Sequence, residues 1–221
     1  MNAPDRDDDL NNNDRPSSIE RDGGRATGDG RRHNGRMLFE SNAALIVIDV
    51  QKGFADPSWG RRNNPDFEAN LAAILGAWSK ANRPVVLVRH NSRAKASPLH
   101  PDSDGNALEP AVAGMRHDLL VSKDVNSAFY GQPDLHSWLQ ERDIRQLVIC
   151  GVQTNMCVET TSRMGGNLGY DVIVPLDATF TFDLAGPKSE VLTADELSRS
   201  TAVNLHGGGF ARVITTGELL A

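Results

Sequence analysis

Short, continuously apolar segments alternate along most of this chain with longer segments in which apolar residues recur at helical spacing. The run "AALIVIDV" at 43–50 is rich in β-branched residues, as expected for a strand that is buried on both faces. Across 64–84, apolar side chains recur every three or four residues, which predicts a helix. The same alternation predicts further strands at 84–90, 118–123, 145–151, 170–176 and 211–215, and further helices at 132–143, 157–169 and 193–208.

Alternation of buried strands with helices predicts an α/β fold in three layers. We expect a six-stranded, mostly parallel sheet with helices on both faces. This domain covers residues 39–221. Residues 1–38 are crowded with Asp, Asn, Arg, Gly and Ser, and they hold very few large apolar side chains. Such a segment buries too little surface to offset the entropy of ordering it, so we predict a disordered tail.

Composition narrows the choice of partners. The net charge is −6, and the sequence shows neither a cluster of basic residues nor a group of aromatic residues on which bases could stack. It therefore disfavours nucleic acid as a partner. It contains no apolar run long enough to span a bilayer and no hydrophobic segment typical of a secretory signal. We therefore expect a cytoplasmic protein that does not bind membranes.

Reactive side chains follow several of the predicted strands. In open α/β sheets, ligands bind beyond the carboxyl ends of the strands. The first strand ends in Asp49, the second in His90 and the third in Lys123, while Cys157 follows the fourth at the start of a predicted helix. Each of these residues also has an ordinary structural explanation, such as a turn cap or a solvated lysine. Their arrival at one edge of the sheet favours a catalytic site.

Both cysteines lie in the stretch "CGVQTNMC" at 150–157. Two thiols this close are compatible with a disulfide, half of a metal site, a redox couple, or one nucleophile beside one core residue. Cys150 lies inside an apolar run and is expected in the core. At a helix N-terminus, and with Lys123 nearby, Cys157 is expected to have a lowered pKa. Asp49 is then placed to accept the thiol proton and return it to a leaving group.

Three motifs together resemble the isochorismatase-like cysteine hydrolase superfamily: "ALIVIDVQKGF", "VSKDVNSAF" and "ICGVQTNMCVETTSRMGGNLGYDVIVPLDAT". The superfamily includes isochorismatases, nicotinamidases, N-carbamoylsarcosine amidohydrolases and ureidoacrylate amidohydrolases, and the resemblance covers about residues 40–216. It implies a catalytic triad of Asp49, Lys123 and Cys157. It also implies a cis peptide between Val152 and Gln153, an oxyanion hole formed by the backbone N–H groups of Gln153 and Cys157, and a homodimer or homotetramer.

The function implied is hydrolysis of a non-peptide C–N bond in a small amide, ureido or lactam compound, through a thioester on Cys157. Vinyl-ether hydrolysis of the isochorismate type is an alternative, but members with that activity generally lack the nucleophilic cysteine. A catalytically idle binding protein of the same fold and a redox protein that uses both cysteines are further alternatives. Nicotinamidase-like members carry an Asp-x-His pair for a metal. This chain has His90 and His100 but no such pair, so we predict no metal and no cofactor.

Substrate specificity is expected to come from the long polar loop at 91–117, because long loops in compact domains are often functional. Aromatic side chains near the strand ends are candidate walls of a pocket, although ordinary packing also accounts for them. The predicted substrate-binding residues are Phe54, Trp59, His90, Arg93, Phe129 and Gln153.

Overall fold

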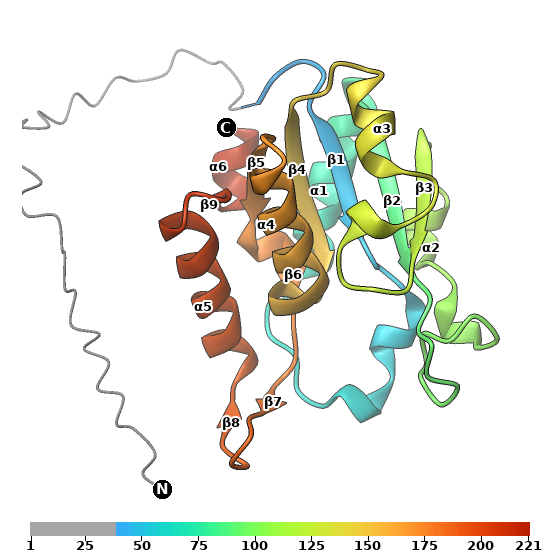
Figure 1. The fold of residues 1–221 in the computed structure, drawn as a ribbon, viewed down its shortest axis with the longest axis vertical. Coiled ribbons are helices and arrows are strands. Elements are labelled where there is room, and N and C mark those ends of the chain that lie inside the picture. The colour runs from blue at the N-terminus through green and yellow to red at the C-terminus, as the bar shows by residue number, and fades with distance from the viewer. Residues whose placement is uncertain (1–38) are drawn as a thin grey trace, which may run out of the picture. The chain divides into compact units, whose positions relative to one another are not determined.

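The computed structural model describes residues 39–221, so the tail predicted at 1–38 lies outside the described residues. A parallel sheet forms the centre of the domain, in the order β3-β2-β1-β4-β5-β9 (Figure 1). This is the predicted α/β architecture. The strands are β1 (Ala44–Ile48), β2 (Val85–His90), β3 (Leu119–Lys123), β4 (Gln146–Val152), β5 (Asp171–Pro175) and β9 (Arg212–Ile214).

Successive side chains of each strand point to opposite faces of the sheet and so divide the interior into two cores. In β1, Leu45 and Val47 join one core, whereas Ile46 and Ile48 join the other. Residues of α1, α2 and α6 pack in the first core. Residues of α3 and α5 pack in the second core with Cys157 and Val158, which directly precede α4. The helices are α1 (Phe67–Lys80), α2 (Pro110–Ala113), α3 (Leu135–Gln140), α4 (Glu159–Asn167), α5 (Ala194–Gly207) and α6 (Thr216–Leu220). Among the described residues, no helix has the length and apolar character needed to cross a membrane.

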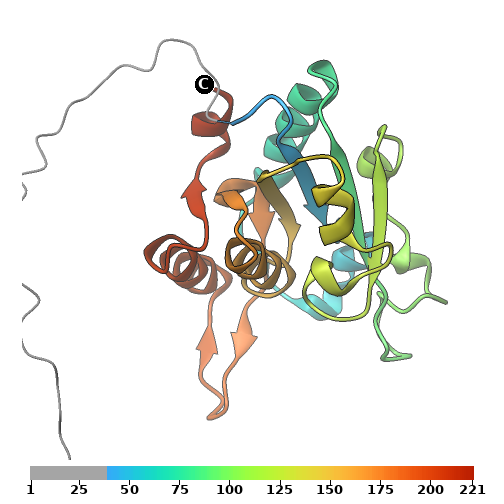
Figure 2. The same cartoon turned by 45° about the horizontal axis from the view of Figure 1, so that its top comes forward.

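Several short elements were not predicted. The segment 91–117 contains α2, and a final short helix, α6, follows β9. Strand β6 (Thr179–Phe180) pairs with β4 beyond the end of β5. Strands β7 (Leu184–Ala185) and β8 (Val191–Leu192) form a separate hairpin, which projects from the body of the domain in both ribbon views (Figures 1 and 2).

The strand order reverses between β1 and β4, which lie side by side at the centre of the sheet. From β1 the chain proceeds outward to β2 and β3, and from β4 it proceeds in the opposite direction to β5 and β9. In sheets of this kind, ligands usually bind beyond the carboxyl ends of the two strands where the order reverses, here β1 and β4. Asp49 directly follows β1, and Gly151 lies near the end of β4.

The backbone is tightly packed at these two strand ends. Gly151 pairs with Ile48 and has a φ of +119°, and a Cβ atom at this position would overlap the carbonyl oxygen of Ile48. Asp49 also has a positive φ, +51°, in the left-handed region that aspartate tolerates better than most residues. The two strand ends therefore fix each other where Asp49 leaves the sheet.

We expect Gly151→Ala to lower the free energy of unfolding by about 3 kcal/mol or more, because the new methyl group meets backbone atoms and the φ angle is unfavourable for alanine. Gly76→Ala is the matched control. Gly76 lies on the exposed side of α1 with open space around it, so alanine should stabilise the helix by up to about 1 kcal/mol. Urea denaturation measures both changes. Equal stability of the Gly151→Ala variant and the wild type would contradict the packing described here.

Candidate active site

Three side chains from separate strand ends meet in one buried cluster. The Lys123 Nζ atom lies 2.5 Å from Asp49 Oδ2 and 3.2 Å from Cys157 Sγ. Asp49 is 0% exposed, Lys123 3% and Cys157 8%. The Asp49 Oδ1 atom is buried and has no hydrogen-bond partner among the described residues. The cluster thus contains a charge pair, a thiol and one carboxylate oxygen that accepts no hydrogen bond from the described residues.

The strand register explains how Lys123 reaches Asp49. β3 lies two strands away from β1, with β2 between them. In this register Lys123 is the direct partner of His90, the last residue of β2. Directly paired residues of parallel strands project from the same face, so the lysine side chain passes His90 on its way to Asp49. The Lys123 Nζ atom lies 3.2 Å from His90 Nδ1.

Cys157 lies in a wide turn that continues into α4. The π-helical turn Thr154–Val158 precedes the first residue of α4, so Cys157 is inside the turn and not at the first helical position as the sequence predicted. The peptide bond between Val152 and Gln153 is cis, as the family resemblance implies. The carbonyl oxygen of Gln153 accepts hydrogen bonds from the N–H groups of Met156 and Val158. The turn therefore holds Gln153 and Cys157 close together at the end of β4.

The electrostatics of the thiol correct the expectation drawn from the sequence. Burial raises the pKa of Cys157 to about 12, with a further contribution from the Asp49 charge, and Lys123 opposes both effects only in part. Burial also raises the pKa of Asp49 above its ordinary value, although Lys123 acts in the opposite direction. The expectation of a lowered thiol pKa was wrong because it considered the helix terminus and the lysine, but not burial and a neighbouring carboxylate. At neutral pH Cys157 is therefore a neutral thiol.

The two cysteines lie on opposite sides of the sheet. Cys150 belongs to the core that contains α1, Cys157 belongs to the other core, and both thiols are free. Burial raises the pKa of Cys150 to about 12, and no charged side chain contributes to that shift. This separation argues against the redox couple that the sequence left open.

Two buried amides that the sequence analysis missed hold the end of β2. Gln51 Oε1 accepts a hydrogen bond from the His90 N–H at 2.8 Å, and Gln51 Nε2 donates to the His90 carbonyl oxygen at 3.0 Å. Asn106 Nδ2 donates to the same carbonyl oxygen at 3.1 Å. A polar residue two positions after Asp49, in an otherwise apolar stretch, was the available signal for Gln51. Asn106 gave no such signal, because it lies in an irregular loop.

Asn126 is a second residue that the sequence analysis missed. Its side-chain oxygen lies 3.9 Å from Cys157 Sγ, and the residue itself is exposed. The loop that carries it is fixed to α4, since the N–H of Ala128 donates to Thr161 Oγ1 at 3.1 Å. Asn126 therefore borders the thiol on its accessible side.

Metal-type ligands surround the ammonium group. Single ligand atoms of Asp49, His90 and Cys157 lie within 4.8 Å of one another, a grouping that resembles an open metal site. Lys123 Nζ, however, is within hydrogen-bonding distance of all three. A divalent cation at their centre would meet a buried positive charge, so these residues do not fit a metal ion while Lys123 is in place.

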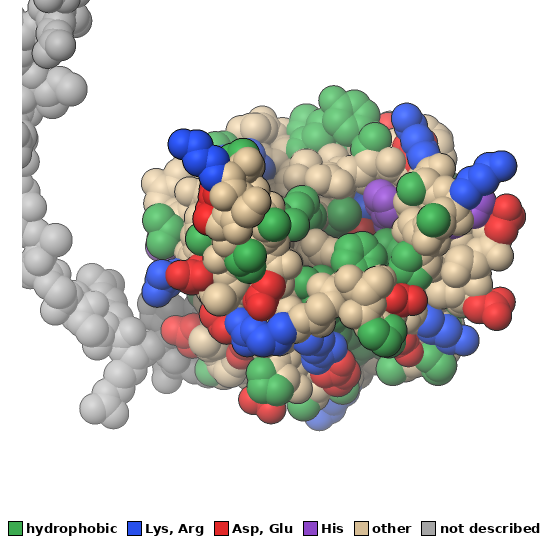
Figure 3. All heavy atoms as spheres, turned by 90° about the horizontal axis from the view of Figure 1, so that it is seen from below, with side chains coloured by type: hydrophobic (Ala, Val, Ile, Leu, Met, Phe, Trp, Pro, Cys, Tyr) green, Lys and Arg blue, Asp and Glu red, His purple; other side chains and the backbone are tan. Residues whose placement is uncertain are grey.

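A recess of about 460 Å³ opens beside Lys123, lined by polar residues from the loops that follow β2 and β3. Arg93 and His100 contribute to its wall, as does Asp124, which pairs with Arg93 at 2.7 Å. Figure 3 shows the face at the carboxyl ends of the strands, where histidine and hydrophobic side chains gather around a hollow. Of the three clustered residues Asp49, Lys123 and Cys157, Lys123 alone lines this recess.

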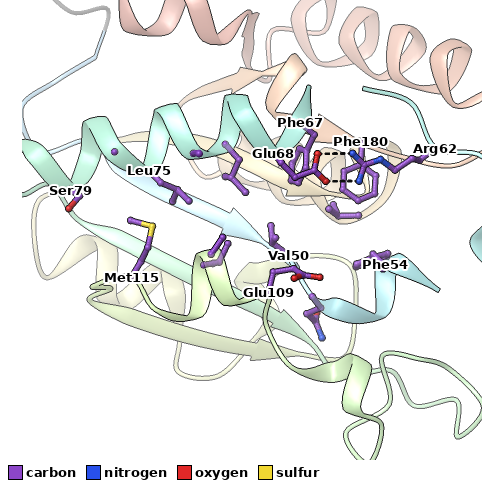
Figure 4. Close-up of a pocket in the computed structure, with 18 residues that line it drawn as sticks. Val50, Phe54, Arg62, Phe67, Glu68, Leu75, Ser79, Glu109, Met115 and Phe180 are labelled. Atoms are coloured by element: carbon purple, nitrogen blue, oxygen red, sulfur yellow. Dashed lines mark hydrogen bonds and ion pairs between the residues drawn. The ribbon is translucent and has the colours of Figure 1, made fainter. Parts of the chain in front are cut away.

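The predicted aromatic wall residues lie elsewhere. Phe54 lines a separate cavity of about 540 Å³ between α1 and α2, which none of the triad residues lines (Figure 4). Trp59 stacks on Phe182 and donates from Nε1 to the Gly53 carbonyl oxygen. Phe129 is buried in the second core and stacks on Tyr170. Ordinary packing accounts for Trp59 and Phe129.

Comparisons with known proteins agree with this architecture. The isochorismatase domain model matches residues 43–215. The uncharacterized isochorismatase family protein YrdC of Bacillus subtilis is 36% identical over 182 residues, which cover 82% of this chain and 96% of that protein. The ureidoacrylate amidohydrolase RutB of Methylobacterium radiotolerans is 30% identical, with coverage of 69% and 71%. A crystal structure of an isochorismatase family protein from Chromobacterium violaceum superposes with a TM-score of 0.77 at 34% identity, covering 84% of this chain and 95% of that one.

Substitutions at Asp49 and Lys123 should move the Cys157 pKa in opposite directions. Asp49→Asn removes the negative charge that raises this pKa, so the pKa should fall and alkylation by iodoacetamide at pH 8 should accelerate about tenfold or more. Lys123→Met removes the stabilising cation and should slow alkylation. Rates against pH, measured in a Cys150→Ser background, test both. A shift of the two profiles in the same direction would refute this account of the thiol.

Proposed function

This chain belongs to the isochorismatase family, and we propose that it hydrolyses a C–N bond in a small amide, ureide or lactam through a covalent thioester on Cys157. The observation that carries the proposal is the position of Lys123 Nζ, within hydrogen-bonding distance of both Asp49 Oδ2 and Cys157 Sγ in a buried cluster. A nucleophile, a proton acceptor and a fixed cation are the parts that acyl transfer requires. The amidohydrolase name of a relative at 30% identity supports the same reaction class.

The first half of the reaction forms the thioester. The Cys157 thiol proton passes to Asp49, and the sulfur attacks the carbonyl carbon of the substrate. Backbone N–H groups of Gln153 and Cys157 hold the oxyanion that develops on the carbonyl oxygen. The C–N bond then breaks as Asp49 returns its proton to the leaving nitrogen, so that ammonia or an amine departs and the acyl group stays on sulfur.

The second half releases the acid. Asp49, again a carboxylate, takes a proton from a water molecule, and the resulting hydroxide adds to the thioester carbon. The C–S bond breaks, the proton held by Asp49 returns to sulfur, and the carboxylic acid leaves. The Lys123 ammonium group lies beside whichever of Asp49 and Cys157 carries the negative charge. One water molecule is consumed for each C–N bond broken.

The recess beside Lys123 is the proposed entry for the substrate. Its polar wall, with Arg93 paired to Asp124, fits a small polar ureide or amide better than a long apolar chain. Of the predicted binding residues, Arg93 lines this recess. His90, which contacts Lys123 Nζ, and Gln153, at the start of the turn that carries Cys157, lie nearest the reacting groups. Phe54 has no corresponding position on this recess.

Assembly and location also remain proposals. We infer a homodimer or homotetramer of a cytoplasmic enzyme, as the family resemblance implies. The presence of two free cysteines fits a reducing compartment. Sedimentation equilibrium over a range of protein concentrations measures the oligomer size directly.

Cys157→Ala should abolish hydrolysis of every substrate that the wild type accepts, a loss of at least about 10³-fold, while the free energy of unfolding changes little. Ammonia release over a panel of amides, ureides and lactams measures the activity. Mass spectrometry of rapidly quenched wild-type enzyme should find an acyl adduct on Cys157. Cys150→Ser is the matched control and should keep its activity. Retained turnover in Cys157→Ala, or adducts on Cys150 alone, would rule out the mechanism.

A further inference from the structure

The Lys123 ammonium group has three N–H donors and three neighbouring acceptors. Two of these acceptors, Asp49 Oδ2 and Cys157 Sγ, belong to the proposed reaction. The third is His90 Nδ1, at 3.2 Å, which the reaction as described does not use. An ammonium group whose three donors are all engaged is fixed in rotation as well as in position.

We propose that His90 is a positioning residue, whose unprotonated Nδ1 accepts the third ammonium proton of Lys123 and thereby aims the other two at Asp49 and Cys157. The inference rests on the proposed function for its kinetic consequences, but the hydrogen bond itself does not depend on any substrate. It gives His90 a role in the resting enzyme, before any substrate binds.

The backbone around His90 is held firmly enough for this role. Gln51 hydrogen-bonds both the N–H and the carbonyl oxygen of His90, and Asn106 donates to the same carbonyl oxygen. Gln51 is 2% exposed, and its position two residues after Asp49 links the end of β1 directly to the end of β2. The segment after β1 that carries Asp49 therefore also fixes the position of the His90 imidazole beside Lys123.

The geometry requires one protonation state of the ring. Nδ1 accepts from an ammonium group only when it carries no proton, so the neutral ring must hold its proton on Nε2. The charged groups that face His90 are Lys123 on β3, Asp124 in the loop that follows it, and Asp49 after β1. The neutral thiol of Cys157 faces it from the turn before α4. Burial and then Lys123 lower the His90 pKa, while the two carboxylates oppose them. The ring is therefore neutral at pH 7.

Protonation of His90 should impair the enzyme. It removes the acceptor and places a second cation beside Lys123, which then loses its third hydrogen bond. Because the His90 pKa is lowered, the loss of activity on acidification should have its midpoint below pH 6.5, the ordinary value for histidine. Protonation of Asp49, whose pKa burial raises, also impairs the proposed reaction, so its contribution must be separated from that of His90.

A substrate-free experiment tests the hydrogen bond. Nitrogen-15 NMR of the full chain labelled at histidine, with His90 assigned from the His90→Asn spectrum, reports the tautomer of each ring. An unprotonated Nδ1 at pH 7.5, which titrates below pH 6.5 and shifts in Lys123→Met, supports the proposal. A proton on Nδ1, or a spectrum of His90 that Lys123→Met leaves unchanged, overturns it. This result stands whether or not the chain proves to be an amidohydrolase.

Kinetics of matched variants test the consequence. His90→Ala should lower kcat about tenfold or more with KM changed less than about twofold, because an orienting partner is lost and not a substrate contact. His90→Asn supplies an amide oxygen near the position of Nδ1 and should recover most of that loss. It should also remove the acid limb that His90 produces, while the limb due to Asp49 remains. His206→Ala, at an exposed histidine near the end of α5, is the control.

Three outcomes of these kinetic experiments would also overturn the proposal. The first is an equal loss of kcat in His90→Ala and His90→Asn, which indicates simple packing. The second is a defect confined to KM, which indicates a substrate contact only. The third is an acid limb that is identical in the wild type and in His90→Asn.

Discussion

The buried ion pair between Asp49 and Lys123 is the interaction on which the rest of the site depends. Neither side chain is exposed to solvent, and removal of one partner from such a pair leaves an uncompensated charge that costs about 3–5 kcal/mol. The other two groups around the ammonium, the thiol of Cys157 and the imidazole of His90, are acceptors without charge at neutral pH. The site therefore buries one cation and one anion, and its remaining donors and acceptors are arranged to keep that cation in place.

The fold explains why these particular strands supply the pair. Asp49 and Cys157 follow β1 and β4, the two strands between which the strand order reverses. A lysine on β3 has a side chain long enough to reach both residues across β2, and in doing so it must pass the residue with which it is in register. His90 is that residue. The contact between His90 and Lys123 thus follows from strand order and register.

The sequence was sufficient for the parts of the molecule that depend on repeating patterns. The six strands of the main sheet and the positions of Asp49, Lys123 and Cys157 at one edge were predicted from apolar periodicity and from the general geometry of α/β sheets. Strands of two residues, such as β6 and β7, carry no such pattern. The hydrogen bonds from Gln51 to the His90 backbone and the contact between His90 and Lys123 depend on strand register, which a single sequence does not reveal. The predicted lowering of the Cys157 pKa was wrong in direction, because burial makes the largest contribution to the shift and depends on the packed structure.

A thiol with a raised pKa is compatible with nucleophilic catalysis because the proton need not go to solvent. Transfer from Cys157 to Asp49 keeps one cation and one anion in the cluster, and the anion moves only from one hydrogen-bond partner of Lys123 to the other. Burial raises the pKa of both groups, so much of the desolvation cost is common to the two states and cancels from the transfer. The free energy of the proton transfer then depends on how strongly Lys123 stabilises the Cys157 thiolate compared with the Asp49 carboxylate. The orientation of that ammonium is therefore the quantity that the surrounding residues control.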